Sequence, residues 1–342
     1  MLAPDSHAPD GQPWRITTLR NSNGMVATFM DWGATWLSAR VPMRDGSVRE
    51  ALLGCATPSD YLQQSAYLGA TVGRYANRIA HSRIQHNGTI YPLQANQGAH
   101  QLHGGPSGFS NRRWQIVCQS ENEVEYHLDS QDGDQGFPGE LLVSLRYHLA
   151  DDNTLSIHYQ ATVDKPCPVN LTTHAYFNLD AVHGDVRQHR LQLNADHYLP
   201  VDSEGIPSAP LKAVADTSFD FRQAKLVAQD FLQDHDQQQV KGYDHAFLLN
   251  DPQQPAAELW SADGQLQLRV FTTAPALQFY SGNYLQGTPA REQETYHDYQ
   301  GIALESEFLP DSPNHPEWPQ PDCWLQPGES YQSTTRYQLI AG

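Results

Sequence analysis

Apolar and polar residues alternate along several long stretches of the chain, and this two-residue period constrains the fold more than any other feature. In residues 154–163, TLSIHYQATV, one face carries the apolar residues Leu155, Ile157, Tyr159, Ala161 and Val163. The segments LQLRVF (266–271) and YQSTTRYQLI (331–340) repeat the pattern. Alternation of this kind is typical of antiparallel strands with one face against a core.

Tight turns are predicted between such segments. Asparagine–glycine and aspartate–glycine pairs favour two-residue hairpins, because both positions tolerate a positive φ. The chain has them at Asn87-Gly88, Asp263-Gly264 and Asp45-Gly46.

Helical patterns are scarce. Residues 223–234, QAKLVAQDFLQD, are predicted to form a few turns, and residues 58–64, PSDYLQQ, a single turn. Proline and glycine are scattered along the chain, so no linker marks a domain boundary. We therefore predict an all-β protein: one large antiparallel β-sandwich with long loops and few short helices, forming a single domain over residues 1–342.

The charge balance restricts the partners. The 342 residues include 21 Lys and Arg against 39 Asp and Glu, a net charge of -18. Nucleic acids, anionic membranes and polyphosphates all need a cationic surface. We therefore expect none of them as a partner.

Cysteine usage and the first residues favour a cytoplasmic location. The start of the sequence, MLAPDSHAPDGQPW, lacks the basic and apolar regions of a secretory signal. No apolar run approaches the ~18 residues of a membrane span. Cys55, Cys118, Cys167 and Cys323 are widely spaced, as expected of reduced thiols that serve mainly in packing.

Two stretches place titratable groups inside apolar sequence. His174 lies in NLTTHAYFNL, where a buried histidine held by a neighbouring hydroxyl is the plain alternative to a proton donor. In GIALESEFLPDSPN, Glu305 ends an apolar run and Glu307 points to the same face two residues later. A buried carboxylate is costly unless it is paired or functional. We therefore expect one of these two glutamates at a site and the other at a solvated rim.

Other polar clusters are individually weak signals. GRYANRIAHSRI holds Arg74, Asn77 and Arg78, which could equally be surface residues that pair with the acidic excess. His103 precedes Gly104-Gly105 in NQGAHQLHGG, a flexible pair that lets a ligand or another backbone approach closely. A loop histidine without a role is the alternative there.

Six stretches taken together are more informative. GATVGRYANRIA, NQGAHQLHGG, NLTTHAYFNL, GYDHAFLL, ALQFYSGN and ALESEFLPDSPNHPEWP follow one another between Gly69 and Pro319. In this order they resemble the aldose 1-epimerase family, and within it the bacterial galactose mutarotases. The resemblance implies a galactose mutarotase-like supersandwich with an open sugar cleft. It also implies interconversion of the α and β anomers of free hexoses such as D-galactose and D-glucose.

The resemblance also implies roles for particular residues. His174 matches the family's general acid and Glu305 its general base. Sugar-binding positions fall on Asn77, Arg78, His103, Tyr176, Asp244 and Gln278. Asparagine is common in the family at two positions where this chain has His100 and Thr173. No metal and no other cofactor is implied.

The chemistry needs these residue types. Opening a hemiacetal requires a base that takes the C1 hydroxyl proton and an acid that protonates the ring oxygen, and one carboxylate with one imidazole suffices. A glycoside hydrolase built on Glu305 and Asp244 would leave His174 without a function. A zinc enzyme would require H-E-x-x-H or C-x-x-C spacing, which is absent from the sequence.

Two further alternatives stay open. A hexose-6-phosphate 1-epimerase would need a basic cleft mouth, for which Arg74, Arg78 and Arg83 are the nearby candidates. A non-catalytic sugar-binding sandwich should have lost Glu305 or His174. We expect a small-molecule aldohexose as ligand, no nucleic-acid or membrane partner, and a monomer or homodimer.

Overall fold

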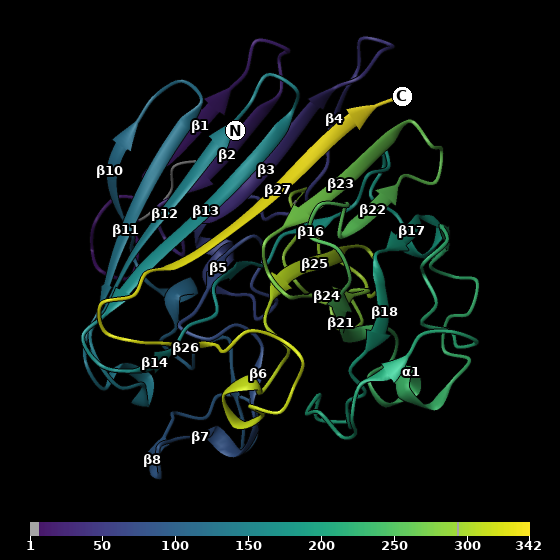
Figure 1. The fold of residues 1–342 in the computed structure, drawn as a ribbon. Helices are drawn as coiled ribbons and strands as arrows, with labels where there is room; N and C mark the ends of the chain where they lie inside the picture. The colour runs from purple at the N-terminus through teal and green to yellow at the C-terminus, as the bar shows by residue number, and fades with distance from the viewer. Residues whose placement is uncertain (1–6, 293) are drawn as a thin grey trace.

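The computed structural model describes residues 7–292 and 294–342, and strands dominate this part of the chain (Figure 1). Neighbouring strands within every sheet are antiparallel. The all-β prediction is therefore confirmed.

The largest sheet has nine strands. Its order from edge to edge is β10 (Gln115–Gln119), β11 (Glu123–Ser130), β12 (Leu141–Leu149), β13 (Thr154–Val163), β27 (Tyr331–Ala341), β23 (Leu266–Thr272), β22 (Ala257–Trp260), β17 (Arg190–Leu193) and β20 (Lys225–Leu226). The C-terminal strand β27 thus lies in the middle of the sheet and joins strands from both halves of the sequence.

Two further sheets complete the main layers. A four-stranded sheet has the order β1 (Ile16–Arg20), β2 (Val26–Met30), β3 (Thr35–Pro42) and β4 (Val48–Glu50). A six-stranded sheet has the order β16 (Tyr176–Phe177), β25 (Ile302–Glu307), β24 (Ala276–Tyr280), β21 (Asp244–Leu249), β18 (Ala195–Tyr198) and β19 (Lys212–Ala213).

Short strand pairs and single helical turns fill the connections. The pairs are β14 (Cys167–Pro168) with β26 (Trp324–Leu325), β15 (Thr172–Thr173) with β5 (Thr71–Val72), β6 (Arg78–Ile79) with β9 (Gln101–Leu102), and β7 (Arg83–His86) with β8 (Thr89–Pro92). The one α-helix of the described residues is α1 (His235–Gln239), and the 3₁₀ helices are Pro58–Leu62, Ala80–Ser82, Phe109–Asn111, Asp134–Gly136, Val186–Gln188 and Ser312–Asn314.

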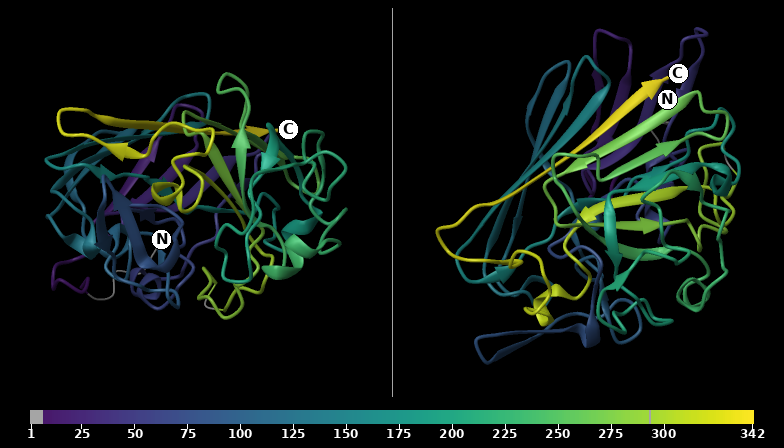
Figure 2. Two further views of the ribbon diagram at one scale, coloured as in Figure 1. Left: turned by 60° about the horizontal axis from the view of Figure 1, so that its bottom comes forward. Right: turned by 45° about the vertical axis from the view of Figure 1, so that its right-hand side comes forward.

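Aromatic side chains join the layers. Phe29 of β2 stacks on Tyr147 of β12 with ring centroids 4.3 Å apart, and Trp36 of β3 meets Tyr337 of β27 at 5.6 Å. Tyr337 also lies 5.3 Å from Phe177 of β16. Both smaller sheets therefore pack against the nine-stranded sheet, whose long strands are conspicuous in both views of Figure 2. Burying each such ring contributes roughly 1.5–3 kcal/mol.

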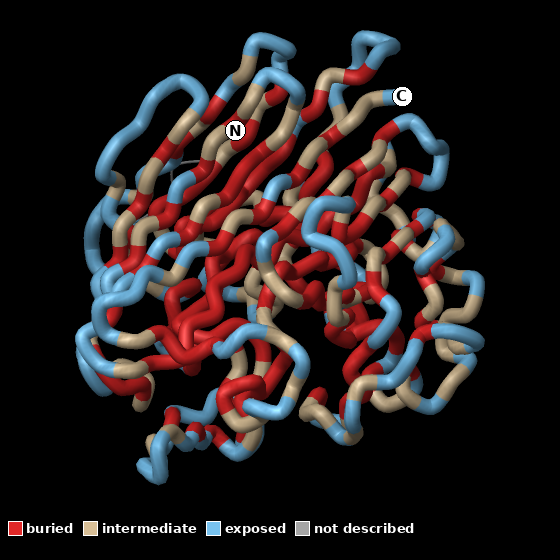
Figure 3. The backbone as a smooth tube through the Cα atoms, viewed as in Figure 1, coloured by how far each residue is buried: buried red, intermediate tan, exposed pale blue. Residues whose placement is uncertain are grey.

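The alternating segments form the expected strands. Leu155, Ile157, Tyr159, Ala161 and Val163 of β13 are all buried. The largest apolar cluster runs in sequence from Leu19 to Leu339, and Figure 3 shows burial concentrated along the inner strands, with exposed residues at the loop tips. This cluster includes residues from all three main sheets.

The hairpin predictions are confirmed, and one helix prediction is wrong. Asn87-Gly88, Asp263-Gly264 and Asp45-Gly46 lie in the β7–β8, β22–β23 and β3–β4 connections. The predicted turn at residues 58–64 is the 3₁₀ helix Pro58–Leu62. Residues 223–234 do not form a helix: the backbone of residues 225–228 pairs with the segment 187–191 at the sheet edge, and turns follow it.

Neither the α-helix nor any 3₁₀ helix in residues 7–292 and 294–342 has the length and apolar character needed to cross a bilayer. All four cysteines are free thiols, and three of them are buried, as the sequence predicted.

Candidate active site

A polar cleft of about 490 Å³ brings together seven of the eight predicted site residues. Those that line it are Asn77, Arg78, His103, His174, Tyr176, Asp244 and Glu305. They come from segments far apart in the sequence, so the cleft exists only in the folded chain.

The six-stranded sheet supplies the acidic side of the cleft. Glu305 lies within β25, directly opposite Gln278 of β24, and Asp244 begins β21 opposite Tyr280. The Gln278 side-chain N–H donates to Oδ1 of Asp244 at 2.6 Å. Gln278 is buried and does not line the cleft, so in this structure it contacts Asp244 rather than the open space.

His174 lies in the connection between β15 and β16. Its backbone N–H donates to the carbonyl of Ala70 at 2.8 Å, and its carbonyl accepts the N–H of Gly69 at 2.9 Å. The ring of Tyr67 stacks against the imidazole with centroids 5.9 Å apart. The segment 67–70 therefore fixes the histidine on its backbone and on its ring face.

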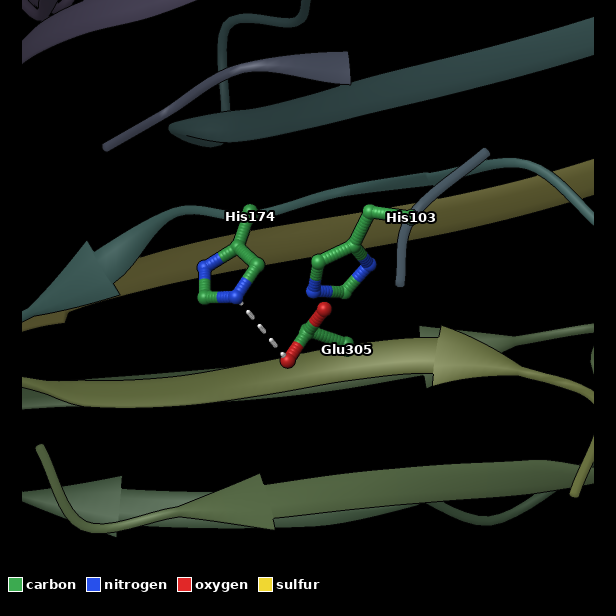
Figure 4. Close-up of side chains that lie close together, drawn as sticks. All are labelled: His103, His174 and Glu305. Atoms are coloured by element: carbon green, nitrogen blue, oxygen red, sulfur yellow. Dashed lines mark ion pairs between the residues drawn. The ribbon is translucent and has the colours of Figure 1, made fainter. Parts of the chain in front are cut away.

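The imidazole of His174 faces the carboxylate of Glu305 (Figure 4). Nε2 of His174 lies 3.5 Å from Oε1 of Glu305, and the two side chains are only 6% and 3% exposed. Nδ1 of His174 and Oε2 of Glu305 have no hydrogen-bond partner among the described residues. Buried polar atoms are rarely left unpaired, so these are the atoms expected to meet a ligand or ordered water.

Burial shifts both groups toward their neutral forms. Burial raises the pKa of Glu305 well above its ordinary value, and the nearby carboxyls of Glu307 and Asp244 add to this rise, whereas Arg78 opposes it. Burial likewise lowers the pKa of His174 to about 4. Both shifts favour the neutral forms, and a carboxylic acid beside a neutral imidazole carries one exchangeable proton.

His103 is fixed in a single tautomer. The backbone N–H of Asn77 donates to Nδ1 of His103 at 3.0 Å, so that nitrogen carries no proton. Burial, with help from the neighbouring His174, lowers the pKa of His103 well below its ordinary value. The ring is therefore neutral, with its proton on Nε2, and can donate one hydrogen bond.

His103, His174 and Glu305 also meet the distance requirement for a metal site, since their donor atoms all lie within 4.8 Å of one another. Metal binding through Nε2 of His103 would require the ring proton to move to Nδ1. That nitrogen already accepts the N–H of Asn77. The hydrogen bond thus favours a donor to a hydroxyl over a metal ligand.

Arg78 and Asp244 face each other across the cleft. Their closest charged atoms, Nη2 and Oδ2, are 3.6 Å apart. Nε of Arg78 donates to Oε1 of Gln97 at 2.8 Å, and the guanidinium packs directly on Gly205, where a Cβ would collide with it. The guanidinium of Arg78 can donate hydrogen bonds to hydroxyl oxygens, and the carboxylate of Asp244 can accept hydrogen bonds from hydroxyl groups.

Two expectations about charged residues are wrong. Glu307 is not at a rim: it is fully buried, because every residue of β25 is covered. Arg74 is also buried, and its guanidinium bonds to main-chain carbonyls of residues 130, 131, 138 and 139, away from the cleft. Arg83 is exposed and does not line the cleft either.

Three aromatic residues of the cleft were missed in the sequence. They are Tyr67, Tyr280 and Tyr284. Tyr280 lies in the motif ALQFYSGN and Tyr284 directly follows it, whereas Tyr67 lies in a loop with no pattern that marks it. Flat aromatic faces suit the apolar faces of a pyranose.

The sandwich holds a buried carboxylate–imidazole pair in a polar cleft lined with aromatic rings, an arrangement that suits proton transfer on a neutral polar ligand. The sequence profile of the aldose 1-epimerase family matches residues 15–338. An aldose 1-epimerase from Escherichia coli (strain K12) is 65% identical over 337 residues, which is 98% of this chain and 97% of that protein. The chain belongs to the aldose 1-epimerase family and is an isomerase.

More distant proteins agree. A galactose mutarotase from Homo sapiens is 36% identical over 315 residues, 91% of this chain and 90% of that protein. The crystal structure of galactose 1-epimerase from Lactobacillus acidophilus NCFM has a TM-score of 0.85 at 32% identity and covers 98% and 97% of the two chains. An aldose epimerase homologue from C. elegans has a TM-score of 0.89 at 29% identity and covers 96% and 99%. The predicted mutarotase-type sandwich is therefore confirmed.

Proposed function

We propose that this protein interconverts the α and β anomers of free aldohexoses, such as D-galactose and D-glucose, by opening and reclosing the pyranose ring. The observation that carries the proposal is the Glu305–His174 pair, 3.5 Å apart and directed into the cleft. The pair provides a base and an acid side by side at the cleft, and opening a hemiacetal requires both.

In the proposed reaction Glu305 removes the proton of the C1 hydroxyl while His174 donates a proton to the ring oxygen. The C1–ring oxygen bond breaks and C1 becomes an aldehyde. Rotation about C1–C2 presents the other face of the aldehyde to the C5 hydroxyl. Reclosure returns both protons, so atoms and charges balance and no redox change occurs.

The reactive form of the pair is carboxylate with imidazolium. Burial alone favours the neutral pair, which carries the same single proton. A hydroxyl that donates to the unpartnered Oε2 of Glu305 stabilises the carboxylate. Substrate binding would therefore shift the proton toward His174, where the reaction uses it.

Four groups around the pair are proposed to hold the sugar. Asp244 accepts from hydroxyls, Arg78 and His103 donate to oxygens, and Tyr176 offers a ring face. Asn77 and Gln278 act behind them, since their side chains bond to Glu307 and Asp244.

The charges of the cleft favour an uncharged sugar over a hexose 6-phosphate. Among the described residues that line it, Arg78 is the only arginine or lysine, and its guanidinium already faces Asp244. Glu204 places a further carboxylate at the same cleft. A phosphate dianion normally needs several arginines or lysines.

The setting of the enzyme is part of the proposal. Free thiols at all four cysteines fit a reducing compartment such as the cytoplasm. The net charge of -18 argues against nucleic-acid and membrane partners. We propose a single domain that works as a monomer or homodimer without a metal or other cofactor.

Polarimetry tests the proposal directly. Freshly dissolved α-D-galactose should lose its excess rotation much faster with the protein than without it, and the Glu305→Gln variant should not accelerate the change. Galactose or glucose should show a much higher kcat/KM than its 6-phosphate, with little effect of ionic strength. A preference for the phosphate that weakens with salt would instead identify a sugar-phosphate epimerase.

A further inference from the structure

Glu307 is a buried titratable residue beside the site that the proposed mechanism does not use. It lies two residues after Glu305 on β25, is 0% exposed, and does not line the cleft. Its Oε1 accepts the side-chain N–H of Asn77 at 2.8 Å, while its Oε2 has no hydrogen-bond partner within the described chain. Its hydrogen-bonded link to the cleft therefore runs through Asn77.

Asn77 connects three residues of the site region. Its side-chain nitrogen donates to Glu307, and its Oδ1 accepts the backbone N–H of Arg78 at 2.8 Å. With both ends of the amide engaged, its orientation is fixed. The residue has a φ of 65°, in the left-handed region that asparagine adopts more readily than most non-glycine residues.

The backbone of Asn77 then acts on His103. Its N–H donates to Nδ1 of His103, and its carbonyl accepts the backbone N–H of His103, both at 3.0 Å. Because Nδ1 accepts a hydrogen bond, the proton of the neutral His103 ring is on Nε2. That nitrogen lies in the group formed with His174 and Glu305 (Figure 4).

We propose that Glu307 is a positioning residue for ring opening: it anchors Asn77, and Asn77 fixes His103 as an Nε2–H donor facing the sugar. This inference rests on the proposed function. Without the acceptor at Glu307, the amide of Asn77 would have a buried donor with no partner, and the orientation of the residue would no longer be fixed from that side. His103 could then adopt either tautomer, and only one of them donates into the cleft.

Steady-state kinetics provide the first test. Glu307→Met removes the acceptor with little change in volume, and it should lower kcat about tenfold while KM changes less than about threefold. Glu307→Gln keeps an oxygen for Asn77 and should restore kcat to within about threefold of wild type. Ser306→Ala, a buried neighbour on β25 whose hydroxyl has no hydrogen-bond partner among the described residues, is the matched control and should match wild type.

The tautomer of His103 provides a readout that a merely structural residue would not change. Two-bond ¹H–¹⁵N spectra of histidine-labelled protein should show that Nε2 of His103 is protonated in wild type and in Glu307→Gln. The His103 signal is identified as the one that disappears in the His103→Gln variant. In Glu307→Met the His103 signal should show a mixture of the Nε2–H and Nδ1–H tautomers. If the methionine variant does not fold, Glu307→Ala carries the same expectation.

An unchanged tautomer and unchanged kcat in a folded Glu307→Met protein would overturn this proposal. The same holds if Glu307→Gln fails to recover kcat. Wild-type protein that turns over no free hexose would overturn the proposed function instead. The tautomer spectra would then still decide whether Glu307 controls His103.

Discussion

Nε2 of His174 lies 3.5 Å from Oε1 of Glu305, although one residue belongs to the connection between β15 and β16 and the other to the middle of β25. Both side chains are almost completely buried, which is costly for two ionisable groups unless they interact. The sheet and the 67–70 segment hold them in contact.

Loss of either member of this pair should abolish most of the activity. Glu305→Gln and His174→Asn keep the approximate size of each side chain but remove the base or the acid. We expect kcat to fall by at least ~10²-fold in each variant. Polarimetry measures the loss, and circular dichroism checks the fold. Normal turnover in a folded Glu305→Gln protein would exclude the assignment of the base.

Asp244→Ala should affect binding as well as catalysis. The carboxylate is proposed to hold hydroxyls in the ground state and the transition state alike, so KM should rise along with any loss of kcat. Arg78→Ala should behave in the same way, since it lies on the other side of the same contact. A decrease confined to kcat in Asp244→Ala would point instead to a pair of catalytic carboxylates.

The dependence of kcat/KM on pH should be bell-shaped, because the active pair carries one proton. A second proton is hard to add, since burial lowers the pKa of His174 to about 4, so the acidic limb should lie below the ordinary histidine value of 6.5. The remaining proton is harder to remove than from an ordinary glutamate, since burial raises the pKa of Glu305, so the basic limb should lie well above the ordinary glutamate value of 4.5. Rate measurements between about pH 4 and pH 10 test this. A maximum below about pH 5 would indicate two ordinary carboxylates.

Removal of metals should leave the activity unchanged. Although His103, His174 and Glu305 are close enough to bind an ion, the N–H of Asn77 occupies the nitrogen of His103 that would need the proton. Dialysis against a chelator, followed by polarimetry and metal analysis, tests this prediction. Lost activity that zinc restores would show that the trio binds a metal.

The free energy of unfolding should decrease as the pH rises from about 4.5 to about 8, the interval between the ordinary pKa of Glu307 and its pKa in the folded protein. Burial raises the pKa of this carboxyl from 4.5 to about 8 in the folded protein. Between these values the folded state binds more protons than the unfolded state, so the free energy of unfolding decreases with pH. Each pKa unit corresponds to about 1.4 kcal/mol, which gives a few kcal/mol in total.

Glu307→Gln should therefore flatten the dependence of Tm on pH between about 5 and 8, because the amide has no proton to lose. The exposed Glu121→Gln variant serves as the control and should keep the wild-type slope. If both variants show the same slope as wild type, the folded carboxyl of Glu307 ionises normally.

Much of the fold followed from local sequence. The alternating segments became β13, β23 and β27, and the Asn87-Gly88 pair closes a hairpin. Both signals depend on backbone geometry and on side chains within a few residues. The segment 223–234 shows the limit of such signals. Its pattern predicts a helix, but Lys225 and Leu226 pair with β17, a partner that the local sequence does not specify.

The sequence by itself determined which residue types were available for proton transfer and sugar binding, because the motifs around Asn77, His103, His174, Asp244 and Glu305 can be recognised one after another along the chain. Their arrangement was decided only by the tertiary structure. Burial, contact and tautomer depend on what neighbouring strands place around each group, and a linear pattern does not contain that information. For this reason Glu307 proved to be buried against Asn77 rather than at a rim, Arg74 proved to face carbonyls rather than the cleft, and Tyr67 entered the site without any signal in its own segment.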